Sequence, residues 1–241
     1  KGNVTPGKPQ VRYRNDDLWH LALINELKTN FPPDNPGFAG VGLKGYHFFY
    51  NLVLAKISNI FSIPVFSLYF HLFPLFVSIL WGIGIYTLMI KWARKKSTAL
   101  WAVFLTMFGG SFAFVLLMQG HEGLSLDSAL GIQQPISSLQ NPPFSISIII
   151  MTAVLICIYN FFHERKRAWL IPMVLCVGLV AMFKVYAGII LFGGIAFLTT
   201  IQILQRKAIF IAACFFIGIL FLANYWILAD HAATLIFYPL W

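Results

Sequence analysis

The sequence predicts an all-helical membrane protein with about six transmembrane helices, preceded by a loop that carries two short helices. Its composition is the first observation: 59% of the residues are hydrophobic and only 10% are charged, whereas a soluble domain carries about 25% charged residues. The mean hydropathy is +0.78. The second observation is that the apolar residues form long runs separated by short basic turns, the arrangement that is typical of multi-pass membrane proteins.

The polar head of the chain is expected to form loops and two interfacial helices. Residues 1–15 are rich in Gly, Pro and basic residues and should be loop. A helical pattern follows over 16–28, which is too short to span a bilayer because a span needs about 20 apolar residues. After a proline-rich loop, residues 46–61 form a second helix that hydropathy alone leaves ambiguous between a short span and a surface helix.

The rest of the chain consists mainly of apolar runs. We expect six spans, at about 65–90, 97–118, 143–162, 168–183, 186–204 and 208–228. The fourth and fifth are separated only by residues 183–188 and should form a tight helical hairpin. Residues 229–241 should begin a further extracytoplasmic segment.

Basic residues resolve the topology, because short loops rich in Lys and Arg stay in the cytoplasm. Three turns, at 91–96, 165–167 and 206–207, carry such clusters. They fall on one side if 65–90 is the first span and 46–61 lies along the membrane, which places residues 1–64 outside. Seven of the eight acids then lie outside as well. These turns also account for the net charge of +9 without any nucleic-acid role.

Two adjacent carboxylates, Asp16 and Asp17, are the strongest candidates for a functional site. Acids are scarce in this chain, with 8 Asp and Glu in 241 residues. On a helix, His20 lies on the same face three and four residues later. The group could act as a general base or bind a metal at the membrane surface. The alternative is that one acid merely caps the helix, but a cap needs only one of them. We favour Asp16 for the chemistry.

Several other polar residues on the expected outer face are candidates for substrate contacts. Tyr46 and His47 should begin the second interfacial helix, where they could bind an acceptor or lipid phosphate or simply anchor the helix. Lys184, between two short spans, could pair with a lipid phosphate or snorkel from a helix end. His121 and Glu122 lie in a long loop after the second span, a kind of loop that is often functional.

Other site classes find little support in the sequence. Cys157, Cys176 and Cys214 lie inside apolar runs with no paired spacing, so we interpret them as small buried residues. There is no nucleotide-phosphate loop, zinc motif or GxSxG sequence.

The head of the chain resembles the GT-C superfamily of integral-membrane glycosyltransferases, which includes protein O-mannosyltransferases and aminoarabinose lipid A transferases. The resemblance covers about residues 14–96. Its counterparts are an acidic motif on a juxtamembrane helix, a proline-containing loop and a second surface helix, found here at 16–24, 31–36 and 43–47. His20 departs from the general motif. Since the chain starts at Lys1 and stops at Trp241, we expect a fragment without the first span and the C-terminal part.

The resemblance implies an inverting hexosyl- or pentosyltransferase. Such an enzyme moves a sugar from a polyprenyl-phosphate donor to a glycan, lipid or protein acceptor at the extracytoplasmic face of the cell envelope. A prokaryotic plasma (inner) membrane is the expected location. An Asp would serve as base or orient the acceptor, and Lys184 or a divalent metal (Mg²⁺ or Mn²⁺, held by Asp16 or Asp17) would offset the charge on the departing phosphate.

Two other function classes stay open. One is a transporter or flippase for a lipid-linked substrate, for which charge within spans and repeated halves are typical. This chain has no obvious repeat, and the hairpin at Lys184 is its one transporter-like feature. The other is a non-catalytic membrane assembly subunit in which the acids are only helix caps.

Overall fold

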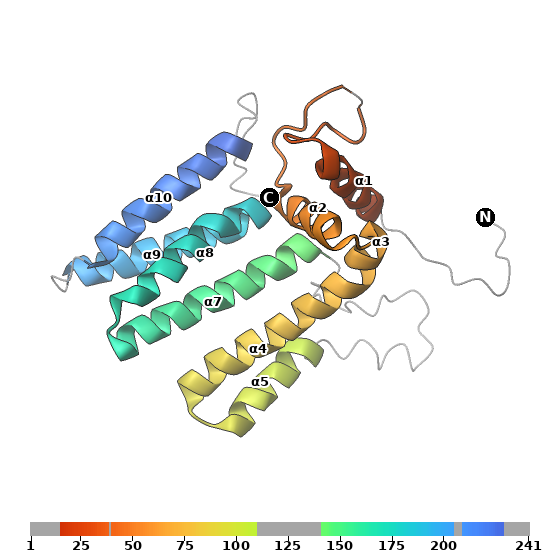
Figure 1. Ribbon diagram of the computed structural model, residues 1–241. Coiled ribbons are helices and arrows are strands. Elements are labelled where there is room, and N and C mark those ends of the chain that lie inside the picture. The colour runs from red at the N-terminus through yellow and green to blue at the C-terminus, as the bar shows by residue number, and fades with distance from the viewer. Residues whose placement is uncertain (1–14, 39, 110–140, 205–208, 229–241) are drawn as a thin grey trace, which may run out of the picture.

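The computed structural model describes residues 15–38, 40–109, 141–204 and 209–228, and every regular element in these ranges is a helix. Figure 1 shows the long helices side by side, with two shorter ones, α1 (Asn15–Thr29) and α2 (Phe49–Phe61), gathered at one end of the row. The loop between α1 and α2 contains one isolated antiparallel bridge, between Asp34 and Gly42. The expected all-helical fold is confirmed for the described residues.

Among the described residues, three helices are long and apolar enough to cross a membrane. The first is a continuous helical stretch of 29 residues, Val65–Ala93, built from α3 (Val65–Ser67), the π-helical turn η1 (Leu68–Leu72) and α4 (Phe73–Ala93). The others are α7 (Pro142–Glu164) and α9 (Val185–Leu204). These are the expected spans at 65–90, 143–162 and 186–204.

The remaining expected spans also correspond to helices. For the span at 97–118, the described helix is α5 (Lys96–Phe108), which ends earlier than expected because Gly109 adopts an extended conformation. Residues from 110 onward lie outside the described part. The span at 168–183 is a shorter apolar helix, Arg167–Phe183, made of the 3-10 turn η3 (Arg167–Trp169) and α8 (Leu170–Phe183). The last is α10 (Ile209–Leu228), with 20 residues.

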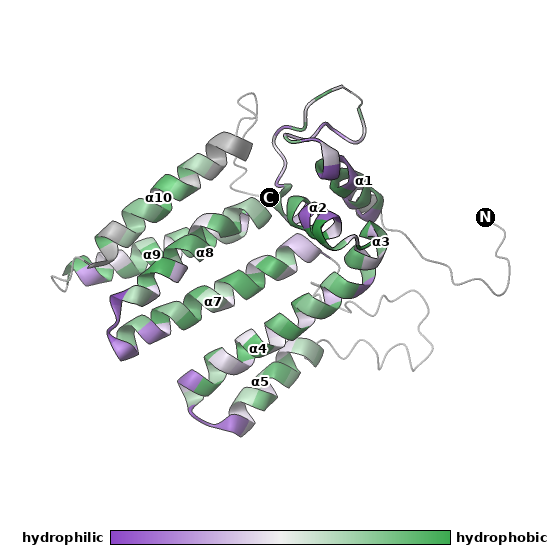
Figure 2. Ribbon diagram, in the orientation of Figure 1, coloured by the Kyte–Doolittle hydropathy of each residue, from purple (hydrophilic) through white to green (hydrophobic). Residues whose placement is uncertain are grey.

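The two described basic turns, α4–α5 and α7–α8, lie at the end of the bundle opposite α1 and α2. Figure 2 shows polar residues on the α4–α5 and α7–α8 turns and on α1 and α2, and apolar residues along the long helices between them. The Tyr159 hydroxyl on α7 donates to the carbonyl of Lys91 on α4 at 2.7 Å, which joins the two helices at this end. All described basic turns are thus separated from α1 by the length of the long helices.

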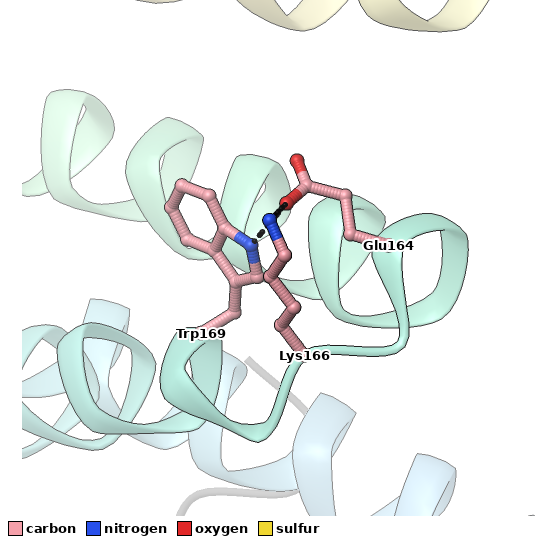
Figure 3. Close-up of polar contacts among 3 residues, drawn as sticks. All are labelled: Glu164, Lys166 and Trp169. Atoms are coloured by element: carbon pink, nitrogen blue, oxygen red, sulfur yellow. Dashed lines mark hydrogen bonds and ion pairs between the residues drawn. The ribbon is translucent and has the colours of Figure 1, made fainter.

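A small polar network closes the α7–α8 turn (Figure 3). The carboxylate of Glu164 accepts a hydrogen bond from the Trp169 indole at 3.1 Å and pairs with the Lys166 ammonium at 3.4 Å. Arg165 between them adopts a left-handed conformation, φ 55°, as does Arg94 in the α4–α5 turn. The two basic turns therefore reverse the chain in the same way.

The first hydrophobic core joins α1 and α2 to the membrane helices. On α1 the buried residues Leu23, Ile24 and Leu27 follow helical spacing and form one face. On α2 the buried face is Tyr50, Asn51, Leu54, Ala55 and Ser58, again at helical spacing. These faces pack together and against residues of η1, the start of α4 and Phe183 at the end of α8.

The second core lies between the long helices α7, α8, α9 and α10. It contains Val154, Met173, Val177, Val180, Ile195 and Ile217, all nearly or fully buried. Helices α8 and α10 approach closely at Gly178: a Cβ placed there would lie 2.8 Å from the Cβ of Leu220 on α10. Small residues at such a crossing let helices pack closely within a membrane.

We expect Gly178→Ala to destabilise the protein. The added methyl group would overlap Leu220, and overpacking of this kind costs about 1–3 kcal/mol. The measurement is the thermal unfolding midpoint of the purified protein in lipid or detergent. Gly193→Ala on α9 is the matched control, because a Cβ at Gly193 has no neighbour within 4 Å. Equal midpoints for the two variants would contradict the close α8–α10 contact.

Candidate functional site

Helix α1 presents Asp17 and His20 toward the start of the first long helix. The Asp17 carboxylate accepts a hydrogen bond from the Tyr69 hydroxyl at 3.2 Å, and the His20 ring stacks on the Tyr69 ring at 6.0 Å. Asp16 lies in the first turn of α1, but its side chain is outside the described part of the structure. Contacts are therefore described for Asp17, whereas the preference for Asp16 stays a prediction.

A local widening of the first long helix positions Tyr69. Tyr69 lies on the π-helical turn η1, in which the Phe73 N–H reaches back five residues to the carbonyl of Leu68. Pro74 follows at once, and a proline inside a helix removes one N–H donor and crowds the carbonyl four residues before it. The wider turn accommodates that proline. Such turns are frequent at functional sites, and this one brings Tyr69 to Asp17.

Helix α2 contributes Tyr50 and Asn51, both fully buried. The Asn51 side chain reaches the His20 imidazole, with 3.1 Å between its amide nitrogen and Nδ1. The Tyr50 ring meets the His20 ring edge-on at 6.0 Å. The Tyr50 hydroxyl has no hydrogen-bond partner within the described structure. Burial, and then the nearby Tyr69 and Asp17, raise the pKa of Tyr50 well above its usual value.

Tyr46 and His47 lie in the segment before α2 rather than in its first turn. The expected helix at 46–61 begins at Phe49, because the chain is still turning at Gly45, whose φ of 66° is a left-handed conformation that favours glycine. The Tyr46 ring stacks on His47 at 4.9 Å and meets Trp19 of α1 edge-on at 5.9 Å. Both residues are half-buried.

Lys184 is the one residue between α8 and α9, and its extended backbone breaks the two helices apart. The expected hairpin therefore turns on a single residue. A contact between the Phe49 and Phe183 rings at 5.2 Å brings the start of α2 to this break. Burial lowers the pKa of His47 from 6.5 to about 4, and the charges of Lys184 and then of His20 add smaller contributions in the same direction. His47 is thus neutral at pH 7.

Together these residues form one group at the α1 end of the bundle, which we call the polar cluster: Asp17, His20, His47, Tyr50, Asn51, Tyr69 and Lys184. It unites three of the predicted regions, the acidic helix, the His47 segment and the Lys184 hairpin. His121 and Glu122 lie outside the described residues, so their predicted role is untested by this geometry.

The described residues do not fit a divalent metal site. Mg²⁺ and Mn²⁺ prefer several oxygen ligands in octahedral geometry. Asp17 is the described carboxylate of the cluster, and one of its oxygens accepts from Tyr69. Within the described ranges no group of three or more His, Cys, Asp or Glu side chains is placed to hold a metal ion. We therefore derive no chemical step through a metal.

Sequence reasoning missed three members of the cluster: Tyr50, Asn51 and Tyr69. A polar Asn on the apolar face of an interfacial helix was a usable signal, because a buried amide needs a partner. Pro74, five residues after Tyr69, was a weaker signal of an irregular helix. Tyr50 offered none, since tyrosine at a membrane interface is common.

The chain matches no protein-family model, no curated protein and no solved structure.

We expect the stability of the protein to fall as the pH is lowered from about 6.5 toward 4. The folded pKa of His47, about 4, lies below its ordinary value of 6.5. In that window the unfolded chain binds more protons, which favours unfolding. Thermal midpoints across this pH range should show the fall. His47→Gln should make it shallower, and Lys184→Met should do so in part by removing a positive charge.

The control for this titration is His163→Gln. His163 is exposed near the far end of α7, where it lies at 3.0 Å from the carbonyl of Tyr159. The His163→Gln variant should show the same dependence of the thermal midpoint on pH as the unmodified protein. A slope that changes equally in the His47 and His163 variants would contradict the assigned environment of His47.

Proposed function

We propose that this protein is a membrane glycosyltransferase of the GT-C kind, which transfers a sugar from a polyprenyl-phosphate donor to an acceptor on the extracytoplasmic face. The observation that carries the proposal is the polar cluster itself. The carboxylate of Asp17 on α1 accepts a hydrogen bond from Tyr69, and the charge of Lys184 at the α8–α9 break acts on His47; both lie at the end of the helices opposite the described basic turns. The reaction requires a carboxylate that takes the proton of the acceptor hydroxyl and a cation that offsets the charge of the donor phosphate.

The position of the basic turns supports the outer location of the cluster. Lys91, Arg94, Lys95 and Lys96 lie in one turn and Arg165 to Arg167 in another, at the same end of the bundle (Figure 2). Basic turns remain in the cytoplasm, so the opposite end would face outward. In this arrangement the three long apolar helices, together with α5, α8 and α10, would supply six spans, and α1 and α2 would lie at the outer surface.

The chemistry follows from the charges. The acceptor hydroxyl oxygen attacks the anomeric carbon from the face opposite the phosphate, and the bond from that carbon to the phosphate oxygen breaks. The leaving polyprenyl phosphate keeps the electron pair, and the acceptor proton passes to an acid of α1. Asp17 is held for this role by Tyr69. Lys184 would offset the negative charge on the leaving phosphate. The aromatic rings around His20 and His47 suit contacts with a sugar and a lipid tail.

A transporter of a lipid-linked substrate is the second candidate. The observation in its favour is the single-residue break at Lys184, since broken helices bearing charge are typical of transporter binding sites. Movement of a labelled lipid-linked sugar across proteoliposomes, without transfer to an acceptor, would favour this function over the first.

Asp17→Asn should abolish sugar transfer without loss of the folded protein. The amide keeps the shape of the carboxylate but cannot accept the acceptor proton, and loss of a general base costs about 100-fold or more. The measurement is sugar release from polyprenyl-phosphate donors by protein reconstituted in lipid, for Asp16→Asn, Asp17→Asn and the double variant.

Asp34→Asn is the matched control for this experiment. Asp34 lies in the loop after α1, where its backbone N–H is 3.5 Å from the Glu26 carboxylate near the far end of that helix. It should retain full transfer. Unchanged transfer in both single variants and in the double Asp16/Asp17 variant would rule out the proposed role of the acids.

A further inference from the structure

Asn51 makes all its described polar contacts with a single residue, His20. Its side chain is fully buried on the inner face of α2. The amide nitrogen lies 3.1 Å from His20 Nδ1 and 3.4 Å from the His20 backbone carbonyl, and the amide oxygen lies 3.3 Å from the same Nδ1. The side chain of one helix thus contacts both the ring and the main chain of the other.

The backbone carbonyl decides which way the Asn51 amide faces. A carbonyl oxygen can only accept, so the group beside it has to be the amide nitrogen. Reversing the amide would set two acceptor oxygens against each other in a buried position, where an unmet polar group costs about 1–3 kcal/mol. The amide nitrogen carries two hydrogens and can donate one to the carbonyl and one to Nδ1. It is the nearer of the two amide atoms to Nδ1, at 3.1 Å against 3.3 Å for the amide oxygen.

The consequence concerns the proton on His20. If Nδ1 accepts from Asn51, the ring proton of the neutral imidazole has to be on Nε2. The ring is held in this orientation from two sides, stacked on Tyr69 and edge-on to Tyr50. The other titratable groups around it are Asp17, bound to Tyr69, and His47, whose surroundings include Lys184.

We infer that Asn51 is a positioning residue that holds His20 as the Nε2–H tautomer, so that His20 acts in the site as a hydrogen-bond donor. A ring in this state cannot take a proton on Nε2. In glycosyl transfer the partners of such a donor are oxygens, whether of a carboxylate, a phosphate or a sugar hydroxyl. The general-base role then falls to the acids of α1. This division of labour rests on the proposed function, whereas the tautomer itself does not.

The tautomer can be measured directly on the full chain in lipid nanodiscs. Two-bond nitrogen–proton spectra of protein labelled with ¹⁵N-histidine separate the Nε2–H, Nδ1–H and doubly protonated forms. The six histidines are few enough to assign, and His20→Gln identifies the His20 signal by its loss. At pH 7.5 we expect the Nε2–H pattern. Either of the other two forms would overturn the inference.

A pair of matched substitutions on α2 tests whether Asn51 is the cause. Asn51→Asp places a carboxylate oxygen at Nδ1 and should convert His20 to an Nδ1–H or doubly protonated form. Asn59, two turns further along the same helix, also joins α2 to α1, by donating to the Lys28 carbonyl at 3.1 Å. Asn59→Asp should therefore leave the His20 pattern unchanged.

Two results would overturn the role of Asn51. One is a His20 signal that keeps its original pattern in folded Asn51→Asp, and the other is the same change in both Asp variants. If Asn51→Asp does not fold, Asn51→Ser replaces it, and its loss of the amide donor should weaken the preference for Nε2–H. An unaltered preference would again count against the inference.

The transfer assay separates this inference from the proposed function. In active protein, Asn51→Asp should lower kcat by about 10-fold, as expected when a partner that orients a functional histidine is lost, and should shift the pH profile. Asn59→Asp should change neither. If no donor is turned over by the unmodified chain, the proposed function fails, while the tautomer measurement still decides the role of Asn51.

Discussion

The polar cluster depends on the contact between the apolar faces of α1 and α2. A helix of 15 residues is marginal in isolation, so α1 needs a partner that covers Leu23, Ile24 and Leu27. Burying each such side chain contributes about 1.5–3 kcal/mol. The contact that buries these residues also fixes the rotation of α1, and the same rotation turns His20 toward Asn51 and Asp17 toward Tyr69.

The two cores are held by different forces. In the first, α1 and α2 are too short to cross a membrane, and the hydrophobic effect contributes to the burial of their apolar side chains. In the second, helices apolar enough to cross a membrane gain little from that effect, because lipid tails are equally apolar. Close packing has to replace it, which explains the approach of Gly178 to Leu220. The cluster lies where these two kinds of packing meet, joined by the Phe49–Phe183 contact.

The helices could be predicted from the sequence because composition and periodicity determine them locally. Every predicted helix has a counterpart among the described residues. Helix α2 starts late because Gly45 delays it, and α5 ends at Phe108 because Gly109 is extended. The acids, His47 and Lys184 could be found as polar residues in an apolar chain. Their convergence could not, since it depends on the rotation of α1. The partners Tyr69 and Asn51 were equally hidden, because their roles come from a π-helical turn and from the facing surface of another helix.

The charges of the cluster suit a reaction in which a proton moves to a carboxylate while negative charge develops on a phosphate. Asp17 provides a carboxylate on the α1 side and Lys184 an ammonium at the α8–α9 break, while burial keeps His47, which lies near Lys184, neutral. If His47 were also protonated, it would add a second positive charge beside Lys184. With His47 neutral, a proton can move toward Asp17 as charge develops on a phosphate near Lys184. Under the proposed function, the low pKa of His47 therefore keeps the acid and the cation in separate roles.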